Sequence, residues 1–238
     1  MNQYQFHAPI LTKWNKVILI GAGASFLVHS ILKAIGLSLV QIFALSPSGL
    51  MSGFIFQLVT YPFVETQLMS FIFNSLLIWF IGSELESQWG SRVYLRFMLM
   101  VSILVGLVYS LIIFIFFYGT SIYSNPFHGL AGLNFALLIA YAVLYPDRSL
   151  SLMMIFPMKA RTFCLILAGI EAYVAIFSGG TSSWGHLLAM GLAYLILRFQ
   201  SNPLIYKALN ASFPTKKRSK NHLYVVKDED QKPPKFWQ

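Results

Sequence analysis

Apolar residues along this chain gather into six stretches, separated by segments rich in polar residues, glycine or proline. A helix needs about 20 residues to cross a hydrocarbon core of about 30 Å. The pattern therefore predicts an all-α, polytopic membrane protein with six transmembrane helices at about residues 16–36, 62–82, 93–118, 129–145, 160–177 and 184–199. Because the fourth and sixth stretches are short, we expect the other helices to enclose them.

Residues 37–61, between the first two stretches, are too apolar for a hydrated loop and too interrupted by serine, proline and glycine to span. Short helices resting in the membrane interface suit such a segment. We expect three parts in the chain: a cytoplasmic N-terminal segment (1–15), a six-helix membrane domain (16–200) and a basic, largely disordered cytoplasmic tail (201–238).

Composition supports a membrane protein, since 57% of residues are hydrophobic and 11% charged, against about 25% charged in soluble domains. Lysine residues stand at the start of the first stretch, and lysine or arginine residues follow the second and the sixth and lie between the fourth and the fifth. Lys33 is the one basic residue near the other three connections. The positive-inside rule then predicts that both termini are cytoplasmic. The compact layout leads us to expect a bacterial inner membrane.

The net charge of +9 also bears on partners. The run "KKRSK" at residues 216–220 suits anionic lipids, and no nucleic-acid-binding motif accompanies it. We expect no cofactor and no metal ion. A transporter is not favoured, because the two halves show no duplication.

Small residues recur at every fourth position in two of the stretches. Such stripes let two helices pack closely in lipid, so we expect the fourth and sixth helices to pack together. The stripes are Gly132, Ala136 and Ala140 in the fourth stretch and Gly185, Ala189 and Ala193 in the sixth.

Polar residues inside the stretches are candidates for function, because they are costly in lipid unless they face a partner or a cavity. They are Glu65, Ser70 and Asn74 in the second stretch, Glu171 in the fifth and His186 in the sixth. His186 adjoins the small-residue stripe and is therefore the strongest candidate.

Four segments together resemble the rhomboid family of intramembrane serine proteases (peptidase S54-like). They are "FQLVTYPFVETQLMSFIFNSLLIWFIGSELESQWGS", "GLAGLNFALLIAYAVLYPDR", "FPMKAR" and "WGHLLAMGLAYLILR", in the family's order. The resemblance implies a six-helix bundle. It also implies a Gly-x-Ser-Gly motif at the start of the fourth helix, whose serine is activated by a histidine on the sixth.

Placed on this sequence, the motif glycines are Gly129 and Gly132, the general base is His186 and the nucleophile position is Ala131. Alanine has no hydroxyl group, so it cannot attack a carbonyl. The motif therefore keeps its glycines and its histidine and lacks the hydroxyl oxygen that would attack the substrate.

The oxyanion positions implied by the resemblance also differ. The family's His, His and Asn pattern becomes Glu65, Ser70 and Asn74, so that Ser70 replaces an oxyanion histidine. An ionised Glu65 close by would oppose negative charge on the reacting oxygen. Phe56 and Gln57 stand where Trp and Arg are common. Several coordinated differences favour natural loss of proteolysis over an engineered serine-to-alanine change.

The sequence thus favours a rhomboid pseudoprotease that binds transmembrane segments of client proteins without cleaving them. The alternative is an active intramembrane serine endopeptidase, with Ala131 engineered or with the nucleophile moved to Ser183 or Ser70. The ordinary interpretation of Ser183 is a cap of the sixth helix, and of Ser70 a buried group satisfied by a neighbour. If proteolysis is lost, we expect His186 to lie beside Asn74 and Glu65. The oligomeric state stays open.

Overall fold

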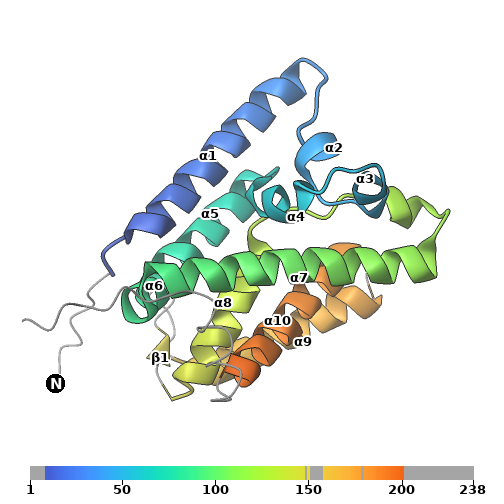
Figure 1. The fold of residues 1–238 in the computed structure, drawn as a ribbon. Coiled ribbons are helices and arrows are strands. Elements are labelled where there is room, and N and C mark those ends of the chain that lie inside the picture. The colour runs from blue at the N-terminus through green and yellow to red at the C-terminus, as the bar shows by residue number, and fades with distance from the viewer. Residues whose placement is uncertain (1–8, 148, 151–157, 178–179, 201–238) are drawn as a thin grey trace, which may run out of the picture.

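The computed structural model describes residues 9–147, 149–150, 158–177 and 180–200 (Figure 1). The proposed tail (201–238) and most of the N-terminal segment lie outside the described residues. The described part is mostly helical, as predicted. Its longer helices are α1 (Lys13–Ala34), α5 (Leu68–Leu77), α6 (Ser83–Trp89), α7 (Ser91–Phe117), α8 (Ala131–Leu144), α9 (Ala160–Phe177) and α10 (Thr181–Gln200).

Short elements occupy the segment between α1 and α5. They are α2 (Val40–Phe43), α3 (Pro47–Met51), α4 (Gln57–Thr60) and a 3₁₀ turn at Tyr61–Phe63. This agrees with the short helices expected there. A second 3₁₀ turn, Ser121–Ser124, follows α7, and a hairpin of two-residue strands, β1 (Ser149–Leu150) and β2 (Met158–Lys159), precedes α9. The hairpin is a small exception to an all-α fold.

Four helical segments of the described residues are long and apolar enough to cross a membrane: α1, the continuous segment Leu68–Trp89, α7 and α9. The predicted fourth helix, α8, has 14 residues, or about 21 Å at 1.5 Å per residue. The predicted sixth, α10, has 20 residues, but its first turns are rich in polar groups. The count of six spans is therefore not confirmed.

The second span lies further along the chain than predicted. Residues 62–82 were expected to be helical, whereas the helix runs from Leu68 to Trp89. Pro62 lies in a 3₁₀ turn, and Val64 and Gln67 are extended, so the helix begins late. It continues through a π-helical segment, Ile78–Gly82, and α6, and Gly90 ends it with a φ of +78°, which favours glycine.

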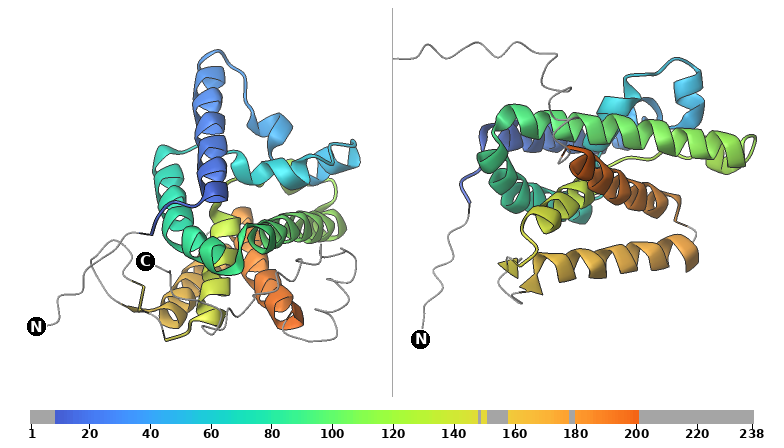
Figure 2. Two further views of the ribbon diagram at one scale, coloured as in Figure 1. Left: turned by 60° about the vertical axis from the view of Figure 1, so that its left-hand side comes forward. Right: turned by 60° about the horizontal axis from the view of Figure 1, so that its bottom comes forward.

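Helix α8 lies at the centre of the molecule, where it contacts α5, α7, α9 and α10 (Figures 1 and 2). The small-residue stripes do pack together, as predicted. Ala136, Ala140, Ala189 and Ala193 are fully buried, and a Cβ atom built on Gly132 would lie 3.9 Å from the Cβ of Ala189. Close packing of α8 on α10 therefore sets the position of the helix that carries His186.

A buried carboxylate ties the start of α1 to α6. Glu86 accepts hydrogen bonds from the backbone N–H groups of Trp14 (3.3 Å) and Asn15 (3.2 Å), and from the Ser91 hydroxyl (2.8 Å). The Asn15 side chain also donates to Glu86 and accepts from the Tyr94 hydroxyl. Glu86 thus satisfies N–H groups at the start of α1 that have no partner within that helix.

Candidate functional site

The segment before α8 is fixed by backbone contacts with two distant parts of the chain. Phe127 exchanges two backbone hydrogen bonds with Leu45, at 2.7 and 2.9 Å. The Gly129 N–H donates to the carbonyl of Tyr61 (3.0 Å), and Nδ1 of His128 lies 3.1 Å from the carbonyl oxygen of Val64. These contacts place the start of α8 beside the segment that precedes α5.

Gly129 has a φ of +100°, a left-handed conformation that other residues rarely adopt. Helix α8 begins directly after this turn, with Leu130 as its N-cap residue and Ala131 as its first residue. A Cβ atom on Gly129 would lie 3.6 Å from Oε1 of Glu65. The first motif glycine therefore forms a tight turn next to a carboxylate.

The Glu65 carboxylate lies at the N-terminus of α8. Its Oε1 accepts hydrogen bonds from the backbone N–H of Leu130 (2.9 Å) and from Nδ2 of Asn74 (2.9 Å). The residue is 2% exposed and lies outside the candidate spanning helices. Burial raises the pKa of the Glu65 carboxyl, while hydrogen bonds from Leu130 and Asn74 act in the opposite direction. A helix N-terminus favours negative charge, so the protein's own carboxylate occupies an anion-binding position.

Asn74 connects this carboxylate to α8. Nδ2 of Asn134 donates to Oδ1 of Asn74 (2.9 Å) and to its backbone carbonyl (3.1 Å). Nδ2 of Asn74 also donates to the Ser70 hydroxyl at 3.2 Å. The structure therefore brings together Glu65, Ser70, Asn74 and the motif turn. Ser70 is satisfied by a neighbour, as its ordinary interpretation expects, but it is half-buried and not buried.

Asn134 was missed in the sequence analysis, although a polar residue in an apolar stretch is itself a signal. It lies three residues after Ala131, one helical turn further along α8, and is buried. Ala131, the first residue of α8, brings only a methyl group to the turn. Its role as the nucleophile position stays a prediction.

His186 forms a pair with Glu171 of α9. Its Nδ1 lies 3.2 Å from Oε2 of Glu171, and the two side chains are 14% and 17% exposed. The ring lies between Phe127 and Phe135, with centroid distances of 5.8 and 5.2 Å. A Cβ atom built on Gly132 would lie 3.9 Å from Cδ2 of His186. His186 thus faces the start of α8.

The expected partners of His186 were wrong. Within the described residues the histidine hydrogen-bonds to Glu171, and not to Asn74 or Glu65. Asn74 and Glu65 bond to each other instead, because the Leu130 N–H draws the carboxylate to the start of α8.

The capping role expected of Ser183 was also wrong. Helix α10 begins at Thr181, so Ser183 lies within its first turn, and its N–H donates to the carbonyl of Gly180. The buried Ser183 side chain hydrogen-bonds to Glu171. Glu171 therefore joins α9 to α10 through two side chains.

The partnership of Glu171 and His186 has a signal in the sequence. Glu171 lies six residues before the end of α9 at Phe177, and His186 lies five residues after the start of α10 at Thr181. Helices joined by a short connection run antiparallel, so these side chains lie at similar depths, about 9 and 8 Å from it. Both residues were candidates from the sequence, but their pairing was not predicted.

Gly185 has a different role from the one its stripe suggested. A Cβ atom on Gly185 would lie 2.6 Å from two ring atoms of Phe127. That ring is buried between Tyr61 and Tyr109, at centroid distances of 5.3 and 4.9 Å. Gly185 thus makes room for an aromatic ring from the segment before α8.

The described residues contain no group of three His, Cys, Asp or Glu side chains suited to a metal ion. What the site offers is two separate carboxylate clusters. One is Glu65 with the α8 N-terminus, and the other is Glu171 with His186 and Ser183.

Known proteins show similarity to this chain at the level of a family and of a single relative. A family described as "Eukaryotic integral membrane protein (DUF1751)" matches residues 16–207. Rhomboid-like protein 19 of Arabidopsis thaliana is 26% identical over 151 residues, which cover 61% of this chain and 49% of that protein. The chain therefore spans about half the length of this relative. The eukaryotic family description speaks against the bacterial inner membrane that the sequence led us to expect.

Proposed function

This chain belongs to the DUF1751 family of eukaryotic integral membrane proteins, and we propose that it is a rhomboid-like pseudoprotease. In this proposal it binds transmembrane segments of client proteins without cleaving them. Similarity to a rhomboid-like protein supports the arrangement of helices. The position of the Glu65 carboxylate is the main observation in support of the proposed loss of proteolysis.

Acyl transfer needs donors that are free to stabilise a developing oxyanion. At the start of α8 the Leu130 N–H and the Asn74 amide instead donate to Glu65. A substrate oxygen would have to displace a buried group of the same protein from these donors. Together with the methyl group of Ala131, this arrangement opposes both nucleophilic attack and stabilisation of its product.

A relocated nucleophile is less well supported. A serine nucleophile needs a base within hydrogen-bond reach, and the described partner of both Ser183 and His186 is Glu171. The described partner of Ser70 is Asn74. Among the described residues, no histidine hydrogen-bonds to either serine hydroxyl.

Client binding is supported by polar groups that lie among apolar helices and are partly accessible. His186 and Glu171 retain exposed area, and His186 lies close to Gly132, which follows the half-buried Ala131 in the sequence. In a membrane, interhelical hydrogen bonds and close packing on small residues drive association. A client segment with small or polar residues could use both.

Fluorophosphonate labelling of the purified chain tests the loss of proteolysis. We expect no labelling of the native chain or of Ala131→Ser. Rebuilding the family pattern with Ala131→Ser, Glu65→His and Ser70→His should give labelling, which a further His186→Ala change should remove. Labelling of the native chain that depends on His186 would contradict the proposal. Equal labelling of Ala131→Ser and the triple variant would show that Glu65 does not block the donors.

Client binding is tested by a photo-crosslinking residue at position 131 in native membranes. The matched control places the same residue at Ile176, an exposed position on α9. We expect discrete crosslinks to single-span proteins from position 131 only. An identical set of products from both positions would contradict a client site at α8.

A further inference from the structure

A shallow groove runs along the first half of α7, away from the candidate site. Two of its residues are basic and the rest are apolar: it is lined by Arg92, Leu95, Arg96, Leu99, Met100, Ile103 and Leu104. Leu99 and Ile103 are exposed, whereas Met100 and Leu104 pack against the core. The groove thus has a charged end and an apolar length.

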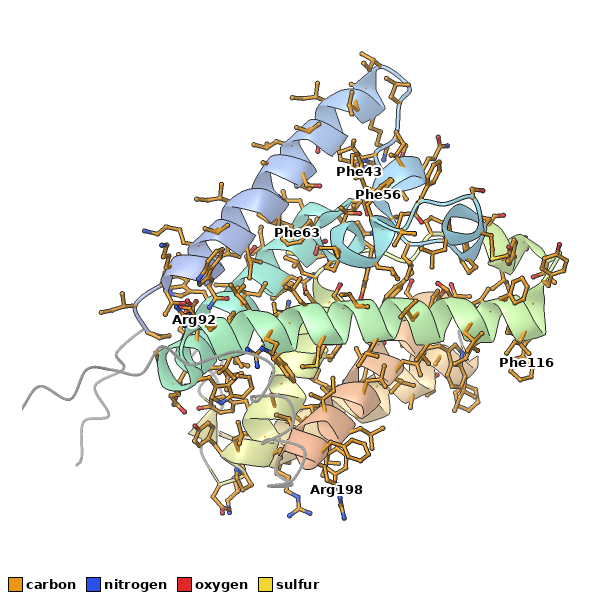
Figure 3. All side chains as sticks on the ribbon, viewed as in Figure 1. Phe43, Phe56, Phe63, Arg92, Phe116 and Arg198 are labelled. Carbon is orange, nitrogen blue, oxygen red and sulfur yellow. The ribbon has the colours of Figure 1, made fainter. Side chains whose placement is uncertain are left out.

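The charged end lies close to a membrane surface. Two candidate spans, Leu68–Trp89 and Ser91–Phe117, meet at Gly90, where the chain reverses direction. Arg92 follows two residues later, in the first turn of α7 (Figure 3), and Arg96 lies one turn further. Leu104 lies 12 residues beyond Arg92, or about 18 Å deeper in the membrane.

We propose that this groove binds an anionic phospholipid. The guanidinium groups of Arg92 and Arg96 would hold its headgroup, since arginine pairs with phosphate and carboxylate oxygens in a planar, often bidentate geometry. One acyl chain would lie along Leu99 and Ile103. In the sequence, these two arginines lie outside the basic run at residues 216–220.

Charge and shape together select this occupant. Arginine flanking a span can serve topology alone, and that role needs no apolar groove. A free phosphate ion would use the arginines and leave the apolar length uncovered. A lipid matches both, with negative charge at the level of the headgroups and hydrocarbon at the depth of Ile103.

Lipid retention by the full chain tests the proposal. The protein is purified in mild detergent with equimolar dioleoylphosphatidylserine and dioleoylphosphatidylcholine, and bound lipid is counted by native mass spectrometry. The test variant is Arg92→Gln/Arg96→Gln. The matched control, Arg161→Gln/Arg198→Gln, removes the same charge from exposed positions on α9 and α10.

We expect the native chain and the control variant to bind more phosphatidylserine than phosphatidylcholine. In the test variant, the ratio of bound phosphatidylserine to bound phosphatidylcholine should fall on the order of tenfold. Excess inorganic phosphate should not displace the lipid, and Ile103→Trp should lower retention by filling the apolar length. Equal preference in the test and control variants would overturn the proposal. Displacement by phosphate would overturn it too, since a simple anion would then suffice.

Discussion

Gly185 shows how a single residue can decide the geometry of the site. Its missing side chain admits the Phe127 ring, and that ring contacts His186. The same aromatic residue holds the segment before α8 through its backbone bonds to Leu45. The glycine therefore links the position of the histidine to the position of the motif turn.

Replacing Gly185 by alanine should destabilise the protein by about 1–3 kcal/mol, because the new methyl group would overlap a ring that cannot move freely. Thermal unfolding in detergent measures the change. Gly191→Ala is the control on the same helix, since the described residues place no atom within 4 Å of its Cβ position. Equal destabilisation by both changes would show that Phe127 is not the cause.

Glu65 carries the second prediction at this scale. Glu65→Leu should cost about 1–3 kcal/mol, because it leaves the buried Leu130 N–H and Asn74 amide without their acceptor. Glu65→Gln keeps a carbonyl oxygen in place and should cost less. Thermal unfolding of the two variants compares them. A leucine variant as stable as the glutamine variant would show that these hydrogen bonds contribute little.

At the scale of elements, α9 is joined to α10 by polar contacts as well as packing. Most of α9 faces outward, and its buried residues are the small Ala160, Cys164 and Ala175. Phe163 and Leu167 pack against the core as well, and the Glu171–His186 pair adds a polar contact between α9 and α10. The histidine is thereby oriented by the helix next to its own.

A double-mutant cycle tests this coupling. Glu171→Ala and His186→Ala should show an interaction energy of about 1–2 kcal/mol in thermal unfolding, as expected for contacting polar groups. The control cycle pairs His186→Ala with Tyr173→Ala, an exposed residue of α9, and should be additive. Additivity in both cycles would mean that the pair does not hold the two helices together.

Much of the element pattern could be predicted from the sequence. Hydrophobic runs located α1, α7, α9 and α10 to within a few residues, because an apolar helix is the simplest way to satisfy a backbone in lipid. The start of the second span was displaced because Pro62 and the extended residues after it interrupt an otherwise apolar run. Local composition does not reveal such a delay.

The candidate site was predictable as a set of residues and not as a set of contacts. Polar residues in apolar stretches pointed to Glu65, Asn74, Glu171 and His186. Which of them bond to each other depends on the turn at Gly129, which directs the Leu130 N–H toward Glu65. A backbone donor has no signature in the side-chain sequence.

At the scale of the whole molecule, the number of membrane crossings determines which connecting segments lie on the same face of the membrane. With six crossings, residues 119–126 and 146–159 lie on opposite faces. With only the four candidate spans, they lie on the same face. Basic residues near the second segment favour the six-crossing arrangement.

Cysteine labelling in sealed vesicles decides between them. Cys164 is the single native cysteine and is buried, so Cys164→Ala gives a suitable background. We expect a membrane-impermeant maleimide to label Ser121→Cys and Asp147→Cys from opposite sides. Labelling of both from one side would establish four crossings.

The Glu86 carboxylate at the start of α1 has a consequence for biosynthesis. The N–H groups of Trp14 and Asn15 bond to a residue 72 and 71 positions later in the chain. A ribosome therefore completes α1 well before it makes the carboxylate that caps it. The N-terminal end of α1 can therefore reach its final position only after the α6–α7 turn has been synthesised. The helix that is made first is among those whose packing is completed late.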